Sequence, residues 1–269
     1  MKTVLSIAGS DPSGGAGIQA DLKTFSAFGL YGMSVISALT AQNTRGVLGI
    51  EACKRDFFLL QLKAVFDDIV PDAIKTGMLF NKDIVSGLAD FLDCLDSIPP
   101  MVIDPVMIAK GGSILLQEDA IRVIKDRLFP HAVLITPNIP EAETLAKIKI
   151  TDREAKLKAC SIILNSGAKA ILIKGGHEDN NRIEDLLVHG DHIRAYYHKR
   201  VRGINPHGTG CTLSSAIASC LALGFGLEES IEKALDYVYK AILNAPHVGH
   251  GNAPLNHNVD TEKLSLIHI

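Results

Sequence analysis

A glycine-rich segment in the C-terminal third of the chain places a cysteine at the start of a predicted helix. The residues Gly208-Thr209-Gly210 lead into a helical stretch over Cys211–Leu223. The first amides of a helix have no partner within it, and the helix dipole adds positive charge there, so this turn can hold a phosphoryl group during its transfer. The same field favours a thiolate, which makes Cys211 a candidate base or nucleophile. The structural alternative, a small buried side chain, is commoner for a single cysteine.

A second glycine-rich loop lies near the N-terminus, over Gly9–Gly17. It lacks both the Gly-Lys-Ser/Thr ending of a P-loop and the glycine spacing of the dinucleotide-binding fingerprint, so neither of these nucleotide sites is indicated. Glycines let the backbone pass close to a ligand, and Asp11 could accept a hydrogen bond from a bound amine or hydroxyl. A tight turn capped by Asp11 explains the loop equally well.

Short apolar runs alternate with amphipathic stretches, a pattern typical of βαβ units around a mostly parallel sheet. The predicted strands are Thr3–Ala8, Met33–Ala41, Ala73–Gly77, Met101–Asp104, Ala132–Thr136 and Ala170–Lys174. The predicted helices are Ala16–Phe28, Asp56–Ile69, Lys82–Leu95, Asp119–Leu128, Pro140–Ala146, Asp152–Ser166, Cys211–Leu223 and Leu227–Asn244. After the sixth strand, Ile183–Val188 and His192–Val201 flank Gly190-Asp191 and predict an antiparallel hairpin at an edge of the sheet.

Polar residues and glycines gather where the predicted strands end. Ligands of open α/β sheets bind beyond the carboxyl ends of the strands, so we expect the functional site at this edge. Besides the first glycine loop, the segments found there are Gln42-Asn43-Thr44, Gly77-Met78, Asp104-Pro105-Val106-Met107, Thr136-Pro137-Asn138-Ile139-Pro140-Glu141 and Lys174-Gly175-Gly176-His177.

The composition restricts the class of protein. The 269 residues are 47% hydrophobic and 21% charged, with a net charge of -3, so a folded chain without a broad nucleic-acid surface is expected. The five cysteines contain no CxxC pair, which favours a reducing compartment over a disulfide framework or zinc cluster. No apolar run is long enough for a membrane helix. We expect one cytoplasmic domain over residues 1–269, with a tail after about residue 258 that is loosely attached.

From Ala8 to His257 the chain resembles the hydroxymethylpyrimidine/phosphomethylpyrimidine kinases. Nine blocks in order are more specific than any one loop. They are the run from Ala8 to Thr24, Leu39-Thr40-Ala41-Gln42-Asn43-Thr44, Lys75-Thr76-Gly77-Met78, Asp104-Pro105-Val106-Met107, Thr136-Pro137-Asn138, Pro140-Glu141-Ala142-Glu143, Lys174-Gly175-Gly176-His177, His207-Gly208-Thr209-Gly210-Cys211-Thr212 and Pro254-Leu255-Asn256-His257. The resemblance implies a ribokinase-like α/β fold in three layers, with helices on both faces of the sheet. It also implies ATP-dependent phosphorylation of 4-amino-5-hydroxymethyl-2-methylpyrimidine and then of its monophosphate, for thiamine synthesis.

The resemblance also implies roles for individual residues. Gln42 would bind the pyrimidine, since an amide both donates and accepts hydrogen bonds. The rest of the pocket would be formed by Asp11, the peptide after Gly17, Met78 and Val106. Cys211 would be the catalytic base, beside an anion hole formed by the amides of Gly208, Thr209 and Gly210.

For the nucleotide, the resemblance implies a site that binds ATP with Mg²⁺. Asp104 and Glu141 would hold the metal directly or through water, as Mg²⁺ prefers carboxylates, phosphates and retained waters. Lys174, Asn138 and Thr209 would contact the ATP phosphates or the water around them. Relatives of this kind are commonly homodimers, which is expected here too.

The sequence departs from the family pattern at two places, where Pro206 stands for an expected threonine and Ala253 for an expected glycine. Neither departure removes a residue with a proposed chemical role.

Three other functions remain open. Pyridoxal kinase activity uses the same fold, although Gln42 and Met78 favour the pyrimidine. A pyrimidine- or nucleotide-binding protein without catalysis is disfavoured by the chemistry-bearing residues that are present. A hydrolase with Cys211 as nucleophile is weaker, because His207 lies too near in sequence to be a clear partner base.

Overall fold

An eight-stranded sheet forms the centre of the molecule. The computed structural model describes residues 1–108, 112, 115–176, 182–201, 203 and 206–261, so His177, Asn205 and most of the predicted tail lie outside the described residues. The strand order is β10-β9-β8-β7-β6-β5-β1-β2; the pairs from β8 to β2 are parallel, and β9 is antiparallel to both of its neighbours, β8 and β10. The strands are β1 (Thr3–Ala8), β2 (Tyr31–Ile36), β5 (Ala73–Thr76), β6 (Met101–Ile103), β7 (Leu134–Ile135), β8 (Ala170–Ile173), β9 (Arg182–His189) and β10 (His192–Lys199).

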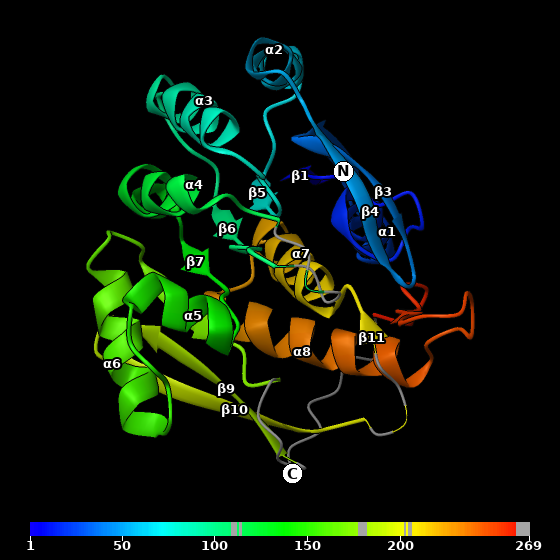
Figure 1. Cartoon of the computed structure of the whole chain (residues 1–269), viewed down its shortest axis with the longest axis vertical. Coiled ribbons are helices and arrows are strands. Elements are labelled where there is room, and N and C mark those ends of the chain that lie inside the picture. Colours follow the sequence, from blue (N-terminus) through cyan, green and yellow to red (C-terminus); the bar gives the residue numbers. More distant parts are fainter. Residues whose placement is uncertain (109–111, 113–114, 177–181, 202, 204–205, 262–269) are drawn as a thin grey trace.

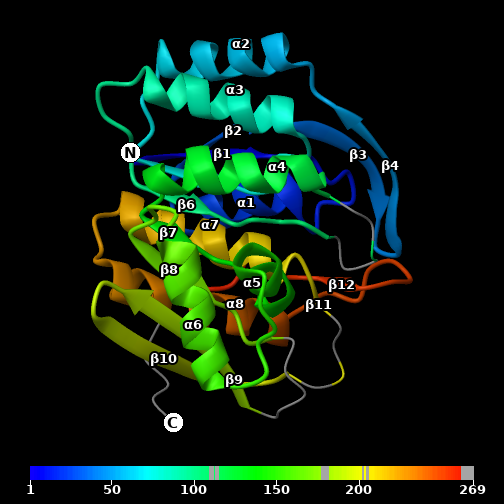
Figure 2. The ribbon, with the colours of Figure 1, turned by 60° about the vertical axis from the view of Figure 1, so that its left-hand side comes forward.

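Helices cover both faces of this sheet, which confirms the expected three-layer α/β fold (Figure 1). Because side chains alternate along a strand, Leu5 and Ile7 of β1 pack on one face and Val4 on the other. Figure 2 shows α2 and α3 on one side and α7 and α8 on the other. The first face carries α2 (Arg55–Phe66), α3 (Lys82–Asp93), α4 (Glu118–Val123), α5 (Ile139–Ala146) and α6 (Arg153–Leu164). The second face carries α1 (Gly17–Ala27), α7 (Thr209–Ala222) and α8 (Leu227–Leu243).

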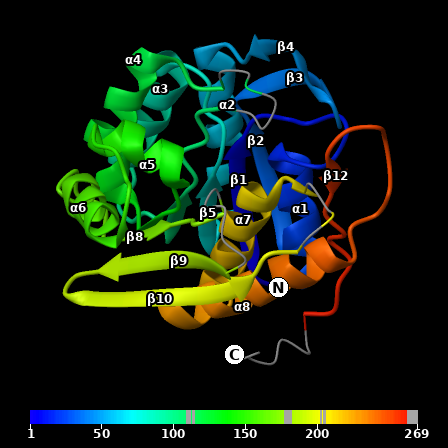
Figure 3. The same cartoon turned by 60° about the horizontal axis from the view of Figure 1, so that its bottom comes forward.

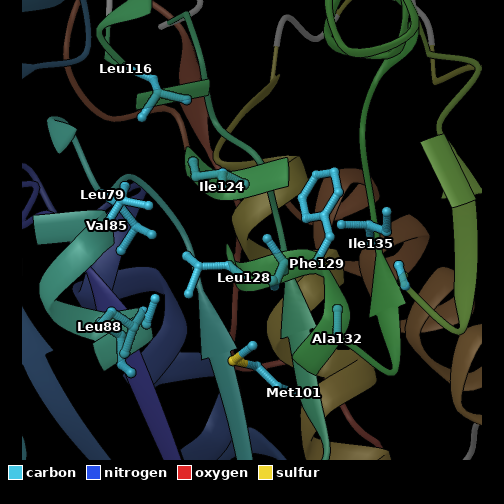
Figure 4. Close-up of a cluster of buried hydrophobic side chains, with 14 of the residues drawn as sticks. Leu79, Val85, Leu88, Met101, Leu116, Ile124, Leu128, Phe129, Ala132 and Ile135 are labelled. Carbon is cyan, nitrogen blue, oxygen red and sulfur yellow. The ribbon is translucent and has the colours of Figure 1, made fainter. Parts of the chain in front are cut away.

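The larger hydrophobic core lies under α2 to α6 (Figure 4). In α3, Ile84, Val85 and Leu88 recur at helical spacing and are fully buried against the sheet. Met101 of β6 and Ile135 of β7 belong to the same core. Burial of this apolar surface is the main stabilising contribution, because each fully buried aliphatic side chain contributes about 1.5–3 kcal/mol.

The strand predicted over Met33–Ala41 is wrong as one element. β2 ends at Ile36, and β3 (Ala38–Asn43) then leaves the sheet and pairs antiparallel with β4 (Gly46–Ala52), which was not predicted. The break is at Ser37, whose amide still bonds to Ala8 O while its hydroxyl donates to Met78 O at 2.5 Å. Gln42 therefore lies on this two-stranded ribbon and not at the end of a strand of the sheet. Figure 2 shows the ribbon in blue beside the sheet.

The helix predicted over Asp119–Leu128 also differs. α4 is followed by a π-helical turn, η1 (Ile124–Leu128), and a 3-10 turn, η2 (Phe129–His131). Pro130 has no N–H, so the α-helical hydrogen bond to the carbonyl of Asp126 cannot form. The Phe129 amide bonds instead to Ile124 O, five residues back. The other predicted helices are present, with ends shifted by up to three residues.

The antiparallel hairpin predicted at a sheet edge is confirmed, since β10 is the last strand of the sheet (Figure 3). A second small pairing joins β11 (Pro206–His207) to β12 (Ala253–Pro254). In this parallel pair Pro206 stands opposite Ala253. The two positions at which the sequence departs from the family pattern are therefore neighbours in space.

A buried ion pair ties the sheet to the helices on its second face. Lys75 of β5 and Asp21 of α1 are both 0% exposed, and Lys75 Nζ lies 2.8 Å from each carboxylate oxygen of Asp21. The hydroxyls of Ser6 in β1 and Ser215 in α7 donate to the same carboxylate at 2.5 and 2.7 Å. The charge is thus fully hydrogen-bonded, as a buried carboxylate must be to be tolerated.

Asp21→Asn should destabilise the protein by about 3–5 kcal/mol, because it leaves the Lys75 ammonium buried without a counter-charge. The matched control is Asp67→Asn, which removes the exposed pair with Lys63 and should cost less than about 1 kcal/mol. Urea unfolding of both variants measures the difference. Equal unfolding midpoints for the two variants would contradict the importance of the buried pair.

Candidate active site

The anion-binding turn predicted at Gly208–Cys211 is the N-terminus of α7. The helix begins at Thr209, two residues earlier than predicted, with Gly208 as its N-cap and no side chain capping the first amides. Gly208 has a φ of 82°, and a Cβ there would overlap the carbonyl oxygen of Gly15. Only glycine fits this position, and the two glycine-rich loops are consequently in contact.

An acid–base pair from the ends of β6 and β8, the two strands that flank β7, lies against this turn. Asp104 follows β6 and Lys174 follows β8, and Lys174 Nζ donates to Asp104 Oδ1 at 2.8 Å. A Cβ at Gly210 would lie 3.1 Å from Lys174 Nζ and 3.4 Å from Asp104 Oδ2, so the α7 amides directly adjoin both charges. Burial lowers the pKa of Lys174, but the carboxylates of Asp104 and Glu141 raise it by more, and the lysine is charged.

Glu141 and Asn138 form the capping box of α5. The Asn138 side chain accepts from the Glu141 amide at 2.9 Å, and the Glu141 carboxylate accepts from the Asn138 amide at 2.8 Å. The spacing Asn-x-x-Glu is a sequence signal for this box, and our sequence analysis missed it. Burial raises the pKa of Glu141 to about 7, the Lys174 charge opposes this increase, and the nearby Asp104 adds to it.

The helix field that favours a thiolate at Cys211 is opposed by the burial of this side chain. Burial raises the pKa of the Cys211 thiol to about 11; Lys75 and the Gly17 amide act in the opposite direction, whereas Asp21 and Asp104 add to the rise. Desolvation penalises the thiolate by more than the helix field favours it. The cysteine therefore rests as a thiol, hydrogen-bonded by the Gly17 amide.

Asp11 is engaged within its own loop. Its carboxylate accepts from the amide and hydroxyl of Ser13 at 2.9 and 2.7 Å, and from the amides of Gly15 and Ala16 at 3.1 and 2.9 Å. Burial raises the pKa of Asp11, but hydrogen bonds from His207 and Ser13 outweigh burial and hold it below its ordinary value. This geometry is that of a tight turn whose amides are capped by the Asp11 carboxylate. A contact of Asp11 with the substrate stays a prediction.

Three of the residues expected around the substrate ring, Gln42, Met78 and Val106, come from separate parts of the chain. Met78 packs with Ala38 and Leu115 in a small apolar cluster between the sheet and the ribbon, and Val106 packs against that cluster. Gln42 reaches across from β3 to His207, with 3.1 Å between Gln42 Nε2 and His207 Nε2. The structure thus brings Gln42 to the second glycine-rich segment, although the two are 165 residues apart.

Two charged or titratable features of the site, the Lys75–Asp21 pair and His207, have no role predicted from the sequence. The Lys75–Asp21 pair lies one helical turn from Cys211, because Ser215, which contacts Asp21, is four residues further along α7. His207 lies between Asp11 and Gln42. The Lys75–Asp21 pair and the two contacts of His207 have no local sequence signal, since each joins residues at least 54 positions apart.

Among the described residues no group of three or more histidine, cysteine or acidic side chains could hold a metal ion by itself. The carboxylates of Asp104 and Glu141 both interact with Lys174, and Asp104 also interacts with Lys75. Two carboxylates beside a phosphate site suit a Mg²⁺ ion that takes its remaining ligands from phosphates and water. No described helix combines the length and the apolar character needed to cross a bilayer.

The chain matches known families over nearly its whole length. A family model described as phosphomethylpyrimidine kinase covers residues 11–256. The hydroxymethylpyrimidine/phosphomethylpyrimidine kinase of Bacillus subtilis is 42% identical, over 94% of this chain and 93% of that protein. The thiamine biosynthesis bifunctional protein ThiED of Geobacter sulfurreducens is 47% identical over 97% of this chain, but the chain spans only 53% of that longer protein.

Solved structures show the same fold. A phosphomethylpyrimidine kinase from Clostridium difficile superposes with a TM-score of 0.80 at 44% identity, over 90% of this chain and 100% of that one. The pyridoxal kinase of Staphylococcus aureus, in complex with AMP-PCP and pyridoxal, gives a TM-score of 0.87 at 32% identity, over 96% of this chain and 94% of that one. The expected ribokinase-like fold is thereby confirmed.

A pKa of about 11 makes the thiolate of Cys211 rare at neutral pH, which predicts slow alkylation. The rate of modification by iodoacetamide should rise about tenfold per pH unit from pH 7 to pH 10 without levelling. Mass spectrometry of the peptide that contains Cys211 measures this rate, with the exposed Cys94 as internal control. A plateau at Cys211 below pH 9 would show that its pKa is not raised.

Proposed function

The chain belongs to the phosphomethylpyrimidine kinase family, and we propose that its site phosphorylates 4-amino-5-hydroxymethyl-2-methylpyrimidine and then its monophosphate, using ATP, in thiamine biosynthesis. The chain is a kinase. The assignment to this site rests on the position of Lys174 and Asp104 against Gly210, in the first turn of α7, where no side chain caps the helix amides. Free amides and a lysine neutralise transferring phosphate, which is the main requirement of phosphoryl transfer.

The ring is proposed to bind between the ribbon and the end of the sheet. Gln42 would hydrogen-bond the aminopyrimidine edge, and Met78 and Val106 would pack on the ring. The hydroxymethyl group would then point to the N-terminus of α7, near the Gly17 amide and Cys211. Asp11 would contribute by holding the first glycine loop in place, in addition to the substrate contact that the resemblance implies.

For the chemical step we propose that the substrate hydroxyl oxygen attacks the γ-phosphorus of ATP. The new O–P bond forms as the bond to the β–γ bridging oxygen breaks, ADP leaves, and the thiolate of Cys211 takes the hydroxyl proton. The amides of Gly208, Thr209 and Gly210 would hold the equatorial oxygens of the phosphoryl group. Because the thiol form predominates, this base works through its small thiolate fraction, and its contribution grows as pH rises.

The nucleotide is proposed to bind beside the strand ends after β6, β7 and β8. Lys174 and Thr209 would contact ATP phosphates, and Asn138 would orient the water around them. Asp104 and Glu141 would hold Mg²⁺, which supplies charge neutralisation for the phosphates. The structure of the Staphylococcus aureus pyridoxal kinase with the ATP analogue AMP-PCP supports ATP as the donor.

Pyridoxal is a second candidate substrate. The TM-score of 0.87 with a pyridoxal kinase that holds pyridoxal favours it, since both rings carry a hydroxymethyl group. The aminopyrimidine remains preferred because the family model and the more identical relatives are pyrimidine kinases. We further propose a cytoplasmic homodimer with one domain per chain, in keeping with the five free cysteines.

Incubation of the pyrimidine alcohol with Mg·ATP should give the monophosphate and then the diphosphate, identified by mass. Cys211→Ala should lower kcat by about 10²-fold, the lower end of the usual contribution of a general base, because only a small thiolate fraction acts at neutral pH. The control is Cys94→Ala, at an exposed position away from the site. Turnover of Cys211→Ala at the parent rate would remove the base assignment, and absence of both products would remove the proposed function.

Asp104→Asn should raise the Mg²⁺ concentration needed for half-maximal activity by about tenfold or more, because one proposed carboxylate ligand is lost. Asp126→Asn, on the exposed surface beside Arg122, serves as the control. A Mg²⁺ titration at saturating ATP measures both. An unchanged Mg²⁺ dependence in Asp104→Asn would exclude Asp104 as a ligand.

A further inference from the structure

His207 joins the two sides of the proposed substrate pocket. It lies on β11, directly before the α7 N-cap, and is partly buried. Its Nε2 is 3.3 Å from Asp11 Oδ2 in the first glycine loop and 3.1 Å from the side-chain amide of Gln42 on the ribbon. A Cβ at Gly15 would lie 2.8 Å from His207 Cδ2, so the ring is packed closely against the loop. No role of His207 follows from the mechanism above.

His207 Nε2 cannot donate a hydrogen bond to Asp11 and accept one from Gln42 at the same time. Asp11 Oδ2 is an acceptor, so a favourable contact requires a proton on His207 Nε2. With that proton in place, the neighbouring Gln42 amide has to present its oxygen to the imidazole. If Gln42 presents its NH₂ group instead, Nε2 has to accept, and its lone pair then faces the Asp11 carboxylate.

Thr40 decides between these two orientations of the Gln42 amide. Its Oγ1 donates to Ser10 O at 2.8 Å and lies 3.3 Å from the end of the amide that faces away from His207. The hydroxyl has a single proton, which Ser10 O takes, so it can only accept from Gln42. Every group is satisfied when Gln42 turns its oxygen to His207 and its NH₂ to Thr40. Amide orientation is assigned from such networks.

We infer that His207 is a positioning residue for the substrate ring, which fixes the orientation of the Gln42 amide through an Nε2–H bond shared with Asp11. This inference rests on the proposed function, because it takes Gln42 as the ring ligand. Both the neutral tautomer protonated on Nε2 and the imidazolium carry the required proton. The imidazole thereby connects the first glycine loop, the ribbon and the α7 turn in one network.

The fixed amide leaves one N–H and one oxygen lone pair of Gln42 for a ligand. A 4-aminopyrimidine edge offers the matching pair, an amino N–H beside a ring nitrogen that accepts. An amide free to turn would present this pattern only part of the time. His207 should therefore affect recognition of the aminopyrimidine more than recognition of pyridoxal, whose ring has no amino group next to a ring nitrogen.

The test compares His207→Leu, His207→Gln, Gln42→Leu and the double variant His207→Leu/Gln42→Leu. Steady-state kinetics with Mg·ATP are measured for the hydroxymethylpyrimidine and for pyridoxal. His207→Leu should raise the KM for the pyrimidine about tenfold, the effect of one net hydrogen bond, with kcat within about threefold of the parent. His207→Gln, which can donate from a similar place, should recover most of the loss. In the Gln42→Leu background, His207→Leu should cause no further increase in KM.

Three results would overturn the inference. The first is an equal loss from His207→Leu with and without Gln42, which would indicate independent roles. The second is a loss confined to kcat, and the third is an equal loss for both ring substrates. If thermal melting shows that His207→Leu fails to fold, it is replaced by His207→Asn, whose shorter side chain cannot reach Gln42.

If the parent protein forms no product, the proposed catalysis fails separately. Calorimetric binding of the pyrimidine to the same variants then decides the role of His207. Absence of that binding would overturn this inference too.

Discussion

The buried salt bridge between Lys75 and Asp21 is the constraint on which the geometry of the site depends. It joins β5 to α1, and the two serine hydroxyls on the same carboxylate bring in β1 and α7. A charge pair inside an apolar layer tolerates little displacement, because any separation leaves two desolvated charges. Helix α7, whose first turn faces the strand ends, is thereby held at a fixed position along the direction of the strands. This position places Cys211 at the strand ends.

Charges around this turn oppose one another in a way that keeps the thiol neutral. Lys75 stabilises a thiolate at Cys211, whereas Asp21, Asp104 and burial destabilise it, and the second group dominates. On the phosphate side, the carboxylates of Asp104 and Glu141 raise the pKa of Lys174. The site thus has two carboxyl groups where a divalent cation is proposed, and helix amides where phosphate is proposed. Asp104 and Lys174 both lie against Gly210, in the first turn of α7.

The sequence predicted the parallel strands and the residues at their ends because buried strands read as short apolar runs bounded by polar residues. It failed at Met33–Ala41, where the apolar pattern continues through Ser37 although the chain leaves the sheet there. It also missed that Glu141 and Asn138 cap α5, a role that their own spacing signals. The contact of His207 with Gln42 could not be found, because long-range side-chain contacts have no periodicity in a single chain.

The pairing of Pro206 with Ala253 bears on how this chain is compared with others. The two residues look like separate departures when read along the sequence, yet they face each other across β11 and β12. Proline offers no N–H to a partner strand, and alanine adds a methyl group where the family pattern has only hydrogen. The two replacements therefore stand at paired positions of one small sheet. A phylogeny that scores these columns independently would treat two neighbouring residues as unrelated.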